Sequence, residues 1–378
     1  MQQQQDAKFI IKTIQLAKRG LGRVSPNPMV GSIVVKDCRI IGTGFHKCFG
    51  QEHAEVAAIR EAGVDACGAT LYVNLEPCCH HGKTPPCTEA IIRAGIKRVV
   101  IGMVDPNPLV NQQGIQILQQ NGIEVTTGVE QQACENLNRA FIKYITQKLP
   151  YVTIKIAQSL DGRIATESGH SQWITNEAAR RESHRIRAAN DAVIVGLGTV
   201  LTDNPSLTVR LTRGKNPVRI VLDSHLRIPL NCNLLTDTYV NQTIIATTTG
   251  NSVKIDRIRE RGAHVWQLEK DAYGKTSISA LMRKMAQARM SAVMVEGGAE
   301  VITSFLREKM ADRIVFAIAP IIIGAGVESI GPLNIATVDD SIHLTKLKFK
   351  QLGTDIIVSG DIVYRENVKQ KVILKKAN

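Results

Sequence analysis

Three short segments in the first quarter of the chain combine residue types that bind a transition metal. His53 and Glu55 stand at the start of an expected helix, Cys78 follows an expected strand, and Cys87 begins the next expected helix. One imidazole and two thiolates leave the fourth position of a tetrahedral zinc ion open for water, as in catalytic sites. Bound zinc lowers the pKa of that water towards about 7 and so supplies hydroxide at neutral pH. We therefore predict that His53, Cys78 and Cys87 bind Zn²⁺.

Glu55 lies two residues after the first predicted ligand and supplies a second group that hydrolysis needs. Its carboxyl group can carry a proton from the zinc-bound water to a leaving amine. The order His-x-Glu, Pro-Cys, Cys is the signature of zinc deaminases, although eight residues instead of two separate the cysteines here. Cys79, His80 and His81 in this interval are additional candidate ligands, and we expect Cys79 to be a packing residue.

Two loops upstream of the metal segments carry polar side chains that could read a substrate. Ser25 to Pro28 form a predicted turn that holds Asn27, and the segment from Gly42 ends on His46. An amide and an imidazole are groups that can hydrogen-bond the polar edge of a heterocycle or a phosphate. We expect Asn27 and His46 to bind the substrate of the zinc site.

Two other interpretations fit the same segments. A closed structural zinc site would make the first domain a binding module without catalysis, but the adjacent carboxylate argues against it. A deaminase of nucleic-acid bases would suit the net charge of +13. However, only 4% of the residues are aromatic, and no basic stretch alternates with aromatic residues as in single-strand-binding surfaces. We expect a small anionic substrate and neither a nucleic-acid nor a membrane partner.

The length and composition favour two globular domains. A chain of 378 residues exceeds the usual size of one domain. Around Lys148 to Pro150 a helical pattern stops and β-branched residues begin to alternate, so we predict domains at 1–149 and 150–378. The start has no signal-peptide pattern, and no run of about 18 apolar residues occurs. We expect a cytoplasmic protein with reduced cysteines. The oligomeric state is left open, and a homo-oligomer is compatible with the sequence.

Alternating helical and strand patterns predict an α/β fold in both domains. In the first domain the predicted strands are 30–36, 39–45, 70–75 and 98–103, with helices at 7–19, from 53, from 88, at 112–120 and up to about 147. In the second domain the predicted strands are 191–196, 218–222, 243–247, 292–295 and 314–318, with helices at 177–189, 277–288 and 300–309. The dipeptide Asp161-Gly162 is also typical of a hairpin turn.

Motifs in both halves resemble one family, the bifunctional deaminase/reductases of riboflavin biosynthesis. The matching stretches are SPNPMVGSIVVKD, GTGFHKCFGQEHAE, LEPCCHHGKTPPC, KIAQSLDGRIAT, SQWIT, GLGTVLTDNPSLTVR and MVEGGAEV. The resemblance implies a cytidine-deaminase-like domain that removes the 2-amino group of 2,5-diamino-6-ribosylamino-4(3H)-pyrimidinone 5′-phosphate. It also implies a dihydrofolate-reductase-like domain that uses NADPH to reduce the ribosyl group, giving 5-amino-6-(5-phosphoribitylamino)uracil.

The resemblance also assigns roles to residues of the second domain. It places Lys155 and Glu296 near the reacting sugar as catalytic residues, with Glu296 also in contact with the substrate. Substrate contacts are implied for Ser171, Arg187, Leu207 and Arg210, and a guanidinium group suits a phosphate because it offers a fixed fork of donors. NADPH contacts are implied for Ala157, Trp173, Thr199, Asp203, Gly298, Ala299, Glu300, Val301, Ile302, Thr303 and Ser304. Independently of the resemblance, the pair Gly297-Gly298 ahead of an expected helix would allow a phosphate to approach the backbone closely.

Overall fold

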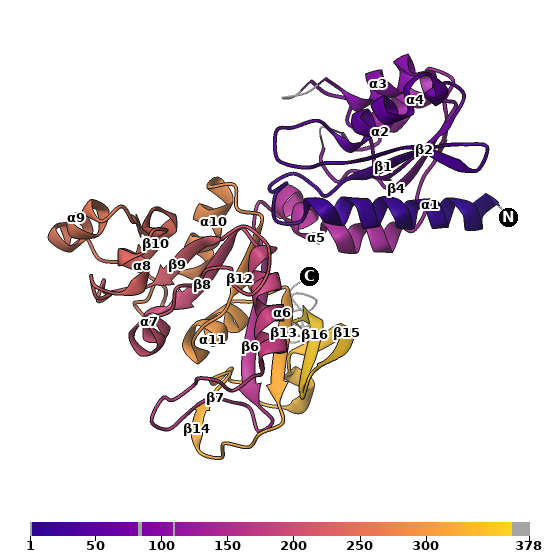
Figure 1. Ribbon diagram of the computed structural model, residues 1–378. Helices are drawn as coiled ribbons and strands as arrows, with labels where there is room; N and C mark the ends of the chain where they lie inside the picture. Colours follow the sequence, from indigo (N-terminus) through magenta and orange to yellow (C-terminus); the bar gives the residue numbers. More distant parts are fainter. Residues whose placement is uncertain (1, 82–84, 109, 365–378) are drawn as a thin grey trace, which may run out of the picture. The chain divides into compact units, whose positions relative to one another are not determined.

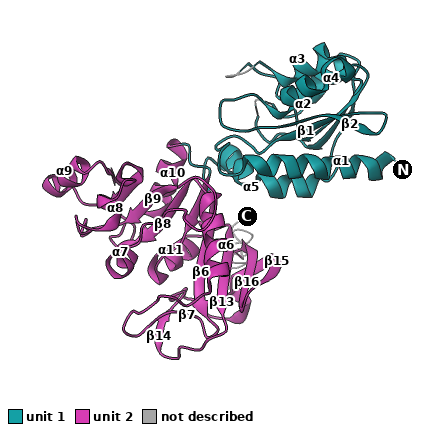
Figure 2. Cartoon of the chain, viewed as in Figure 1, with its two compact units in different colours: residues 1–150, 289–291 teal, residues 151–288, 292–378 magenta. Residues whose placement is uncertain are grey.

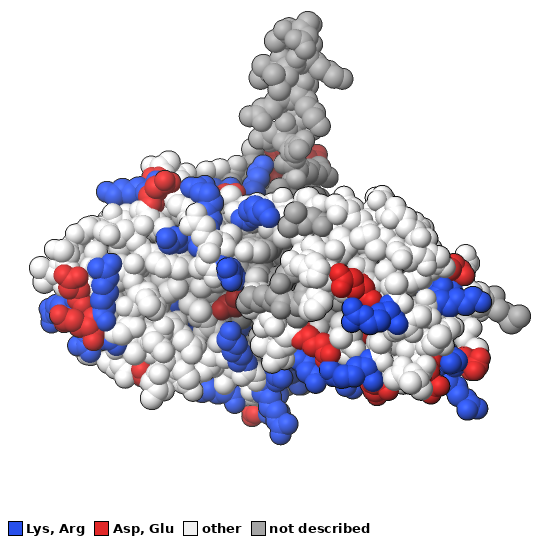
Figure 3. Space-filling view, turned by 90° about the horizontal axis from the view of Figure 1, so that it is seen from above, with Lys and Arg blue, Asp and Glu red and all other residues white. Residues whose placement is uncertain are grey.

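The structure of the protein, a computed structural model, describes residues 2–81, 85–108 and 110–364. The chain separates into two units, residues 1–150 with 289–291 and residues 151–288 with 292–378 (Figure 2). Among the described residues, no helix combines the length and the apolar character that crossing a membrane requires. On the face shown in Figure 3, Lys and Arg side chains are interspersed with Asp and Glu.

Unit 1 is a five-stranded sheet with helices on both faces. The strand order is β2-β1-β3-β4-β5, in which β1 pairs antiparallel with β2 and β3, and β3, β4 and β5 are parallel. Helices α1 and α5 cover one face, and α2, α3 and α4 cover the other (Figure 1). The strands are β1 (Gly31–Lys36), β2 (Arg39–Phe45), β3 (Thr70–Leu75), β4 (Arg98–Met103) and β5 (Glu124–Thr126). The helices are α1 (Gln2–Ala17), α2 (Ala54–Ala62), α3 (Cys87–Arg93), α4 (Gln113–Gln120) and α5 (Gln131–Gln147).

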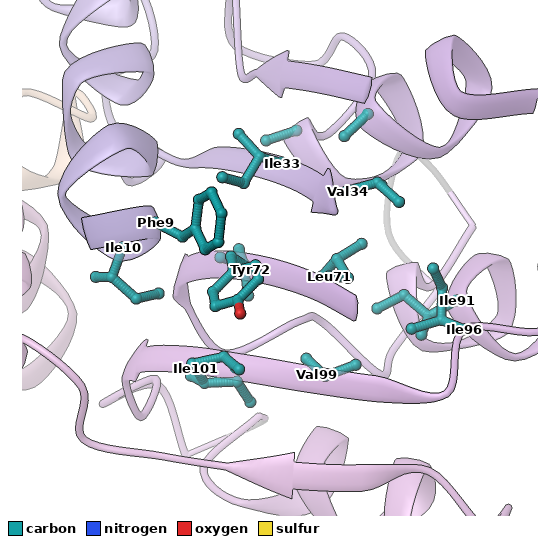
Figure 4. Close-up of a cluster of buried hydrophobic side chains, with 14 of the residues drawn as sticks. Phe9, Ile10, Ile33, Val34, Leu71, Tyr72, Ile91, Ile96, Val99 and Ile101 are labelled. Atoms are coloured by element: carbon teal, nitrogen blue, oxygen red, sulfur yellow. The ribbon is translucent and has the colours of Figure 1, made fainter. Parts of the chain in front are cut away.

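The core of unit 1 forms where the helices meet the strands. Phe9 and Ile10 of α1 lie with Ile33, Leu71 and Tyr72 in the buried cluster of Figure 4. The predicted strands 39–45, 70–75 and 98–103 are confirmed with the same bounds. Helix α1 begins at Gln2 instead of the predicted residue 7, because glutamine is a good helix former and the Gln2 amide donates to Asp6 at 3.1 Å. The predicted set does not include β5, which has only three residues.

Two glycines of β2 allow α2 to approach the sheet closely. A Cβ atom on Gly44 would lie 2.1 Å from the carbonyl oxygen of Ala54, and one on Gly42 would lie 2.2 Å from that of Ala58. Any larger residue at these two positions would push α2 away. The glycines of the GTG segment therefore fix the first turn of α2, next to His53.

Unit 2 is built on a nine-stranded sheet of order β11-β10-β9-β8-β12-β6-β13-β16-β15. All neighbours are parallel except β13 with β16 and β16 with β15. The strands are β6 (Tyr151–Ser159), β8 (Ala192–Gly196), β9 (Val218–Leu222), β10 (Thr243–Thr247), β11 (His264–Gln267), β12 (Ala292–Val295), β13 (Arg313–Ala319), β15 (His343–Leu352) and β16 (Asp355–Val363). The helices are α6 (Glu177–Ala188), α7 (Leu197–Asp203), α8 (Asn233–Thr236), α9 (Ser252–Glu260), α10 (Ile278–Gln287) and α11 (Ala299–Arg307).

A separate two-stranded ribbon changes the expectation for residues 159–162. The chain does turn there, with the Gly162 amide donating to the Ser159 carbonyl at 3.1 Å. However, β7 (Arg163–Thr166) pairs with β14 (Gly326–Glu328) and not with β6, so no β6-β7 hairpin forms. The Asp161 carboxylate instead accepts the Gly324 amide at 2.7 Å, which ties the turn to the segment before β14.

Candidate functional site

The three predicted metal ligands come together beyond the carboxyl end of β3, the central strand of the unit 1 sheet. His53 directly precedes α2, Cys78 lies in the loop after β3, and Cys87 begins α3. The Nδ1 atom of His53 lies 3.2 Å from the Cys87 Sγ atom and 3.5 Å from the Cys78 Sγ atom. All three ligand atoms lie within 4.8 Å of one another. The hydrogen bond from Cys87 is the main cause that lowers the pKa of Cys78 to about 4, so a thiolate is available.

Glu55 is buried in the first turn of α2, two residues after the His53 ligand. The residue is 3% exposed, and its Oε2 atom has no hydrogen-bond partner among the described residues. Burial raises the pKa of Glu55 to about 7, against smaller opposing effects that include the charge of His53. An unpartnered buried oxygen beside two sulfurs and an imidazole fits a zinc ion that carries a water molecule.

His46 lies beside the predicted ligand His53, and Asn27 contacts His46. The His46 ring is 2% exposed and makes an edge contact with the His53 ring, with 5.4 Å between centroids. Its Nε2 atom lies 3.2 Å from the Asn27 amide nitrogen, and its Nδ1 atom lies 3.1 Å from the Glu52 carbonyl oxygen. Burial lowers the pKa of His46, so the ring favours its neutral form. The contact between Asn27 and His46 links two loops that both precede the cysteine ligands in the sequence.

Cys79, His80 and His81 differ from the three ligands in their surroundings. Cys79 lies 4.0 Å from the Gln113 Oε1 atom, and His81 lies 3.2 Å from a Glu89 carboxylate oxygen. The described ligand cluster contains none of these three side chains. The residues that follow, 82–84, lie outside the described part of the chain.

Glu76 holds the loops around the metal site, a role that the sequence did not reveal. Its buried carboxylate accepts four backbone amides, from Asp105 at 3.1 Å, Gln112 at 3.1 Å, Gly114 at 3.1 Å and Ile115 at 3.3 Å. Charge-assisted bonds of this kind are stronger than neutral ones. Glu76 therefore connects the loop that carries Cys78 to the start of α4.

Unit 2 contains a pocket of about 1080 Å³ that gathers most of the residues assigned to it from the sequence. Lys155, Ala157, Ser171, Trp173, Arg187, Thr199, Asp203, Leu207, Arg210, Glu296, Gly298, Ala299, Glu300 and Ile302 all line it. The remaining three residues of the predicted set are elsewhere on α11. Val301 and Thr303 are buried, and the Thr303 and Ser304 hydroxyls donate to carbonyls one turn earlier, at 2.6 Å and 2.9 Å.

One wall of the pocket holds a buried charged cluster. Lys155 lies on β6 and Glu296 directly follows β12, and these two strands are neighbours in the sheet. The Lys155 Nζ atom is 3.9 Å from Glu296 Oε1, and the Arg187 guanidinium donates to Glu296 Oε2 at 2.7 and 3.0 Å. Burial lowers the pKa of Lys155. Burial would raise the pKa of Glu296, but the charges of Arg187 and Lys155 outweigh it and the pKa is lowered.

A glycine turn ahead of α11 directly follows Glu296 and also lines the pocket. A Cβ atom on Gly297 would lie 2.8 Å from the Thr199 hydroxyl oxygen, and Gly298 has a φ of 67°. No side chain caps the start of α11, so its first amides are available to a ligand. Uncapped amides behind a glycine turn fit a phosphate of a dinucleotide such as NADPH. Ser171 donates to Asp203 at 3.0 Å across the same region.

Two activities are thus defined by two sites with separate chemistry, a zinc-dependent deaminase and an NADPH-dependent reductase. Residues 3–103 match the cytidine and deoxycytidylate deaminase zinc-binding region, and residues 150–358 match the RibD C-terminal domain. A riboflavin biosynthesis protein RibD from Aquifex aeolicus is 44% identical over 354 residues, 93% of this chain and 97% of the relative. The chain belongs to the RibD family of bifunctional deaminase/reductases of riboflavin biosynthesis.

Solved structures agree with this assignment over nearly the full length. Acinetobacter baumannii RibD has a TM-score of 0.86 and 36% identity, over 96% of this chain and 99% of that one. A Thermotoga maritima structure has a TM-score of 0.84 and 38% identity, over 97% of this chain and 100% of that one. Its description is a diaminohydroxyphosphoribosylaminopyrimidine deaminase/5-amino-6-(5-phosphoribosylamino)uracil reductase. The predicted fold classes, a cytidine-deaminase-like first domain and a dihydrofolate-reductase-like second domain, are confirmed.

Proposed function

We propose that residues 1–149 deaminate 2,5-diamino-6-ribosylamino-4(3H)-pyrimidinone 5′-phosphate and that residues 150–378 reduce the deaminated product to 5-amino-6-(5-phosphoribitylamino)uracil. The observation that carries this division is the presence of one complete constellation in each unit, the metal ligands with Glu55 and the pocket with Lys155 and Glu296. The description of the Thermotoga maritima relative supports the substrates.

In the deaminase site, His53, Cys78 and Cys87 hold the metal. Zinc bound there supplies hydroxide from water at neutral pH. Glu55 would take a proton from water at the site and return it to the leaving amine, a role that suits a buried carboxyl group with a raised pKa. Asn27 and His46 hydrogen-bond the polar edge of the pyrimidinone, next to the ligands.

In the reductase site, the glycine turn and α11 orient the cofactor towards Lys155. NADPH bound there supplies the hydride that reduces C1 of the ribosyl group. Lys155 donates a proton to the sugar ring oxygen as the ring opens, and its lowered pKa makes the ammonium a better acid. Glu296 remains ionised and holds Lys155 and Arg187 in position.

The substrate contacts of the reductase divide by their exposure. The guanidinium of Arg187 is buried and donates two hydrogen bonds to Glu296. We therefore assign to it the orientation of that carboxylate beside the sugar. Arg210 is exposed at the pocket, and we assign the 5′-phosphate to it. Ser171 and Leu207 complete the substrate wall, and Ala157, Trp173, Thr199 and Asp203 belong with α11 to the cofactor wall. Val301, Thr303 and Ser304 belong to the same helix but lie outside the pocket lining, so we assign them no direct contact with the cofactor.

We further propose that the protein acts in the cytoplasm on free phosphorylated pyrimidines, without nucleic-acid or membrane partners. All eight cysteines are free thiols, which suits a reducing compartment. The mixed charges on the face in Figure 3 favour a small anionic substrate over an extended polyanion. Activity on the free mononucleotide and none on single-stranded DNA or RNA is the expected result. A homo-oligomer is compatible with this proposal, and light scattering at assay concentration measures it.

Replacing Glu296 by Gln tests the division of labour. The amide keeps the shape of the side chain but removes the charge that holds Lys155 and Arg187, so reduction should fall by roughly 10²-fold. Ammonia release should remain at the wild-type rate. The measurement is NADPH consumption with the deaminated intermediate supplied, alongside ammonia release from the first substrate. Loss of ammonia release with unchanged NADPH consumption would contradict the assignment of the two sites.

A further inference from the structure

The pocket loop that carries Leu207 and Arg210 forms hydrogen bonds to other parts of unit 2 at three successive residues, 208 to 210. Leu207 is buried and has a φ of 54°, an unfavourable conformation for a leucine that surrounding contacts must maintain. The Thr208 carbonyl accepts from Arg187 Nη1 at 2.5 Å, and the Val209 amide donates to Asn216 at 2.8 Å. The position of the loop therefore depends on side chains outside it.

His184 on α6 accepts the next of these hydrogen bonds, from the backbone of Arg210. Its ring is 6% exposed, lines the same pocket, and accepts the backbone amide of Arg210 on Nδ1 at 2.9 Å. Accepting requires Nδ1 to be unprotonated. Burial first, and then the charge of Arg187, lower the pKa of His184 to about 4, so the ring is neutral at physiological pH. The neutral ring with its proton on Nε2 therefore accepts this amide at physiological pH.

The same residue, Arg210, is held at its other end by Thr208. Arg210 Nη1 donates to the Thr208 hydroxyl at 3.0 Å, while the Thr208 carbonyl is fixed by Arg187. The imidazole of His184 fixes the backbone from which the Arg210 side chain departs. We propose that His184 is a positioning residue of the reductase, which fixes Arg210 so that its guanidinium meets the phosphate of the substrate. This inference rests on the proposed phosphate contact of Arg210.

The test is steady-state reduction by the full-length protein, with the deaminated substrate and NADPH varied separately. His184→Ala removes one hydrogen bond that orients a phosphate contact, so the KM for the pyrimidine should rise about tenfold. The kcat and the KM for NADPH should stay within about twofold. His184→Asn is the matched control, because its Oδ1 atom is as many bonds from Cα as Nδ1 and accepts a hydrogen bond, and it should restore the KM.

Two further comparisons separate positioning from a general structural role. With the dephosphorylated substrate, the wild type and His184→Ala should have equal KM values. Arg210→Ala should raise the KM for the phosphorylated substrate at least as much as His184→Ala, and the double variant should equal Arg210→Ala, because both act through one contact. If the alanine cavity prevents folding, His184→Leu fills the site without an acceptor and takes its place in every comparison.

The outcomes distinguish the inference from the function on which it rests. A normal KM in Arg210→Ala would overturn the phosphate assignment and the positioning role together. A raised KM in Arg210→Ala with a normal KM in His184→Ala would overturn only the positioning role. The positioning role would also be overturned if His184→Ala still raised the KM tenfold in the Arg210→Ala background, or if His184→Asn did not restore the KM.

Discussion

Replacing Glu55 by Gln should lower the rate of deamination by at least the roughly 10²- to 10⁴-fold that a general acid–base group contributes. The loss should be larger still, because one carboxylate serves several proton transfers. Glutamine keeps the size of the side chain but cannot exchange a proton. Zinc content should be unchanged because Glu55 neighbours the ligand His53 without belonging to the ligand set. Ammonia release and zinc content of the same preparation measure both effects.

Reduction of the supplied intermediate is the internal control for the Glu55 variant. It should proceed at the wild-type rate, since the described residues that line the reductase pocket all belong to unit 2. Near-normal ammonia release from Glu55→Gln would remove this residue from the mechanism. Proton transfer would then fall to the imidazole of His46 or His80, with Asn27 limited to hydrogen bonding.

Cys78→Ser should lose zinc and deamination together. A serine hydroxyl has a much higher pKa than a thiol and is a poor zinc ligand, so two protein ligands would remain. Cys79→Ser is the matched control, because the neighbouring Cys79 lies outside the ligand cluster and should keep both zinc and activity. Zinc content of one atom per chain in Cys78→Ser would exclude this residue as a ligand.

Regular elements were predictable where a strand or helix buries a repeating face. Strands β3, β4, β9, β10 and β12 have the predicted bounds because each is an almost continuous buried run. Helix α7 was missed because its seven residues include glycine and two threonines, which have low helix propensity. β15 and β16 lie beyond the last predicted strand, and β15 is largely exposed, so no buried face marks it.

The two sites differ in how much of each the sequence makes visible. The metal ligands and Glu55 are recognisable because zinc deaminase chemistry demands fixed residue types in a fixed order along the chain. The contacts among the reductase residues are not recognisable from the sequence. Arg187 and Glu296, for example, come together only because of the order of strands and helices in unit 2. His184 and Glu76 are likewise ordinary in sequence. Their importance arises from backbone amides that folding brings to them.

The four backbone amides that donate to Glu76 hold the loops of the metal site in place without a bound metal. They join the loop of Cys78 to the start of α4 through a carboxylate that requires no zinc. Metal uptake then needs little ordering of the chain, in contrast with small zinc domains that fold only when loaded. We expect chelation to abolish deamination while circular dichroism and reduction remain unchanged, and the zinc-free enzyme to recover on simple readdition of the ion. Unfolding of the first domain on chelation would instead assign a structural role to the metal.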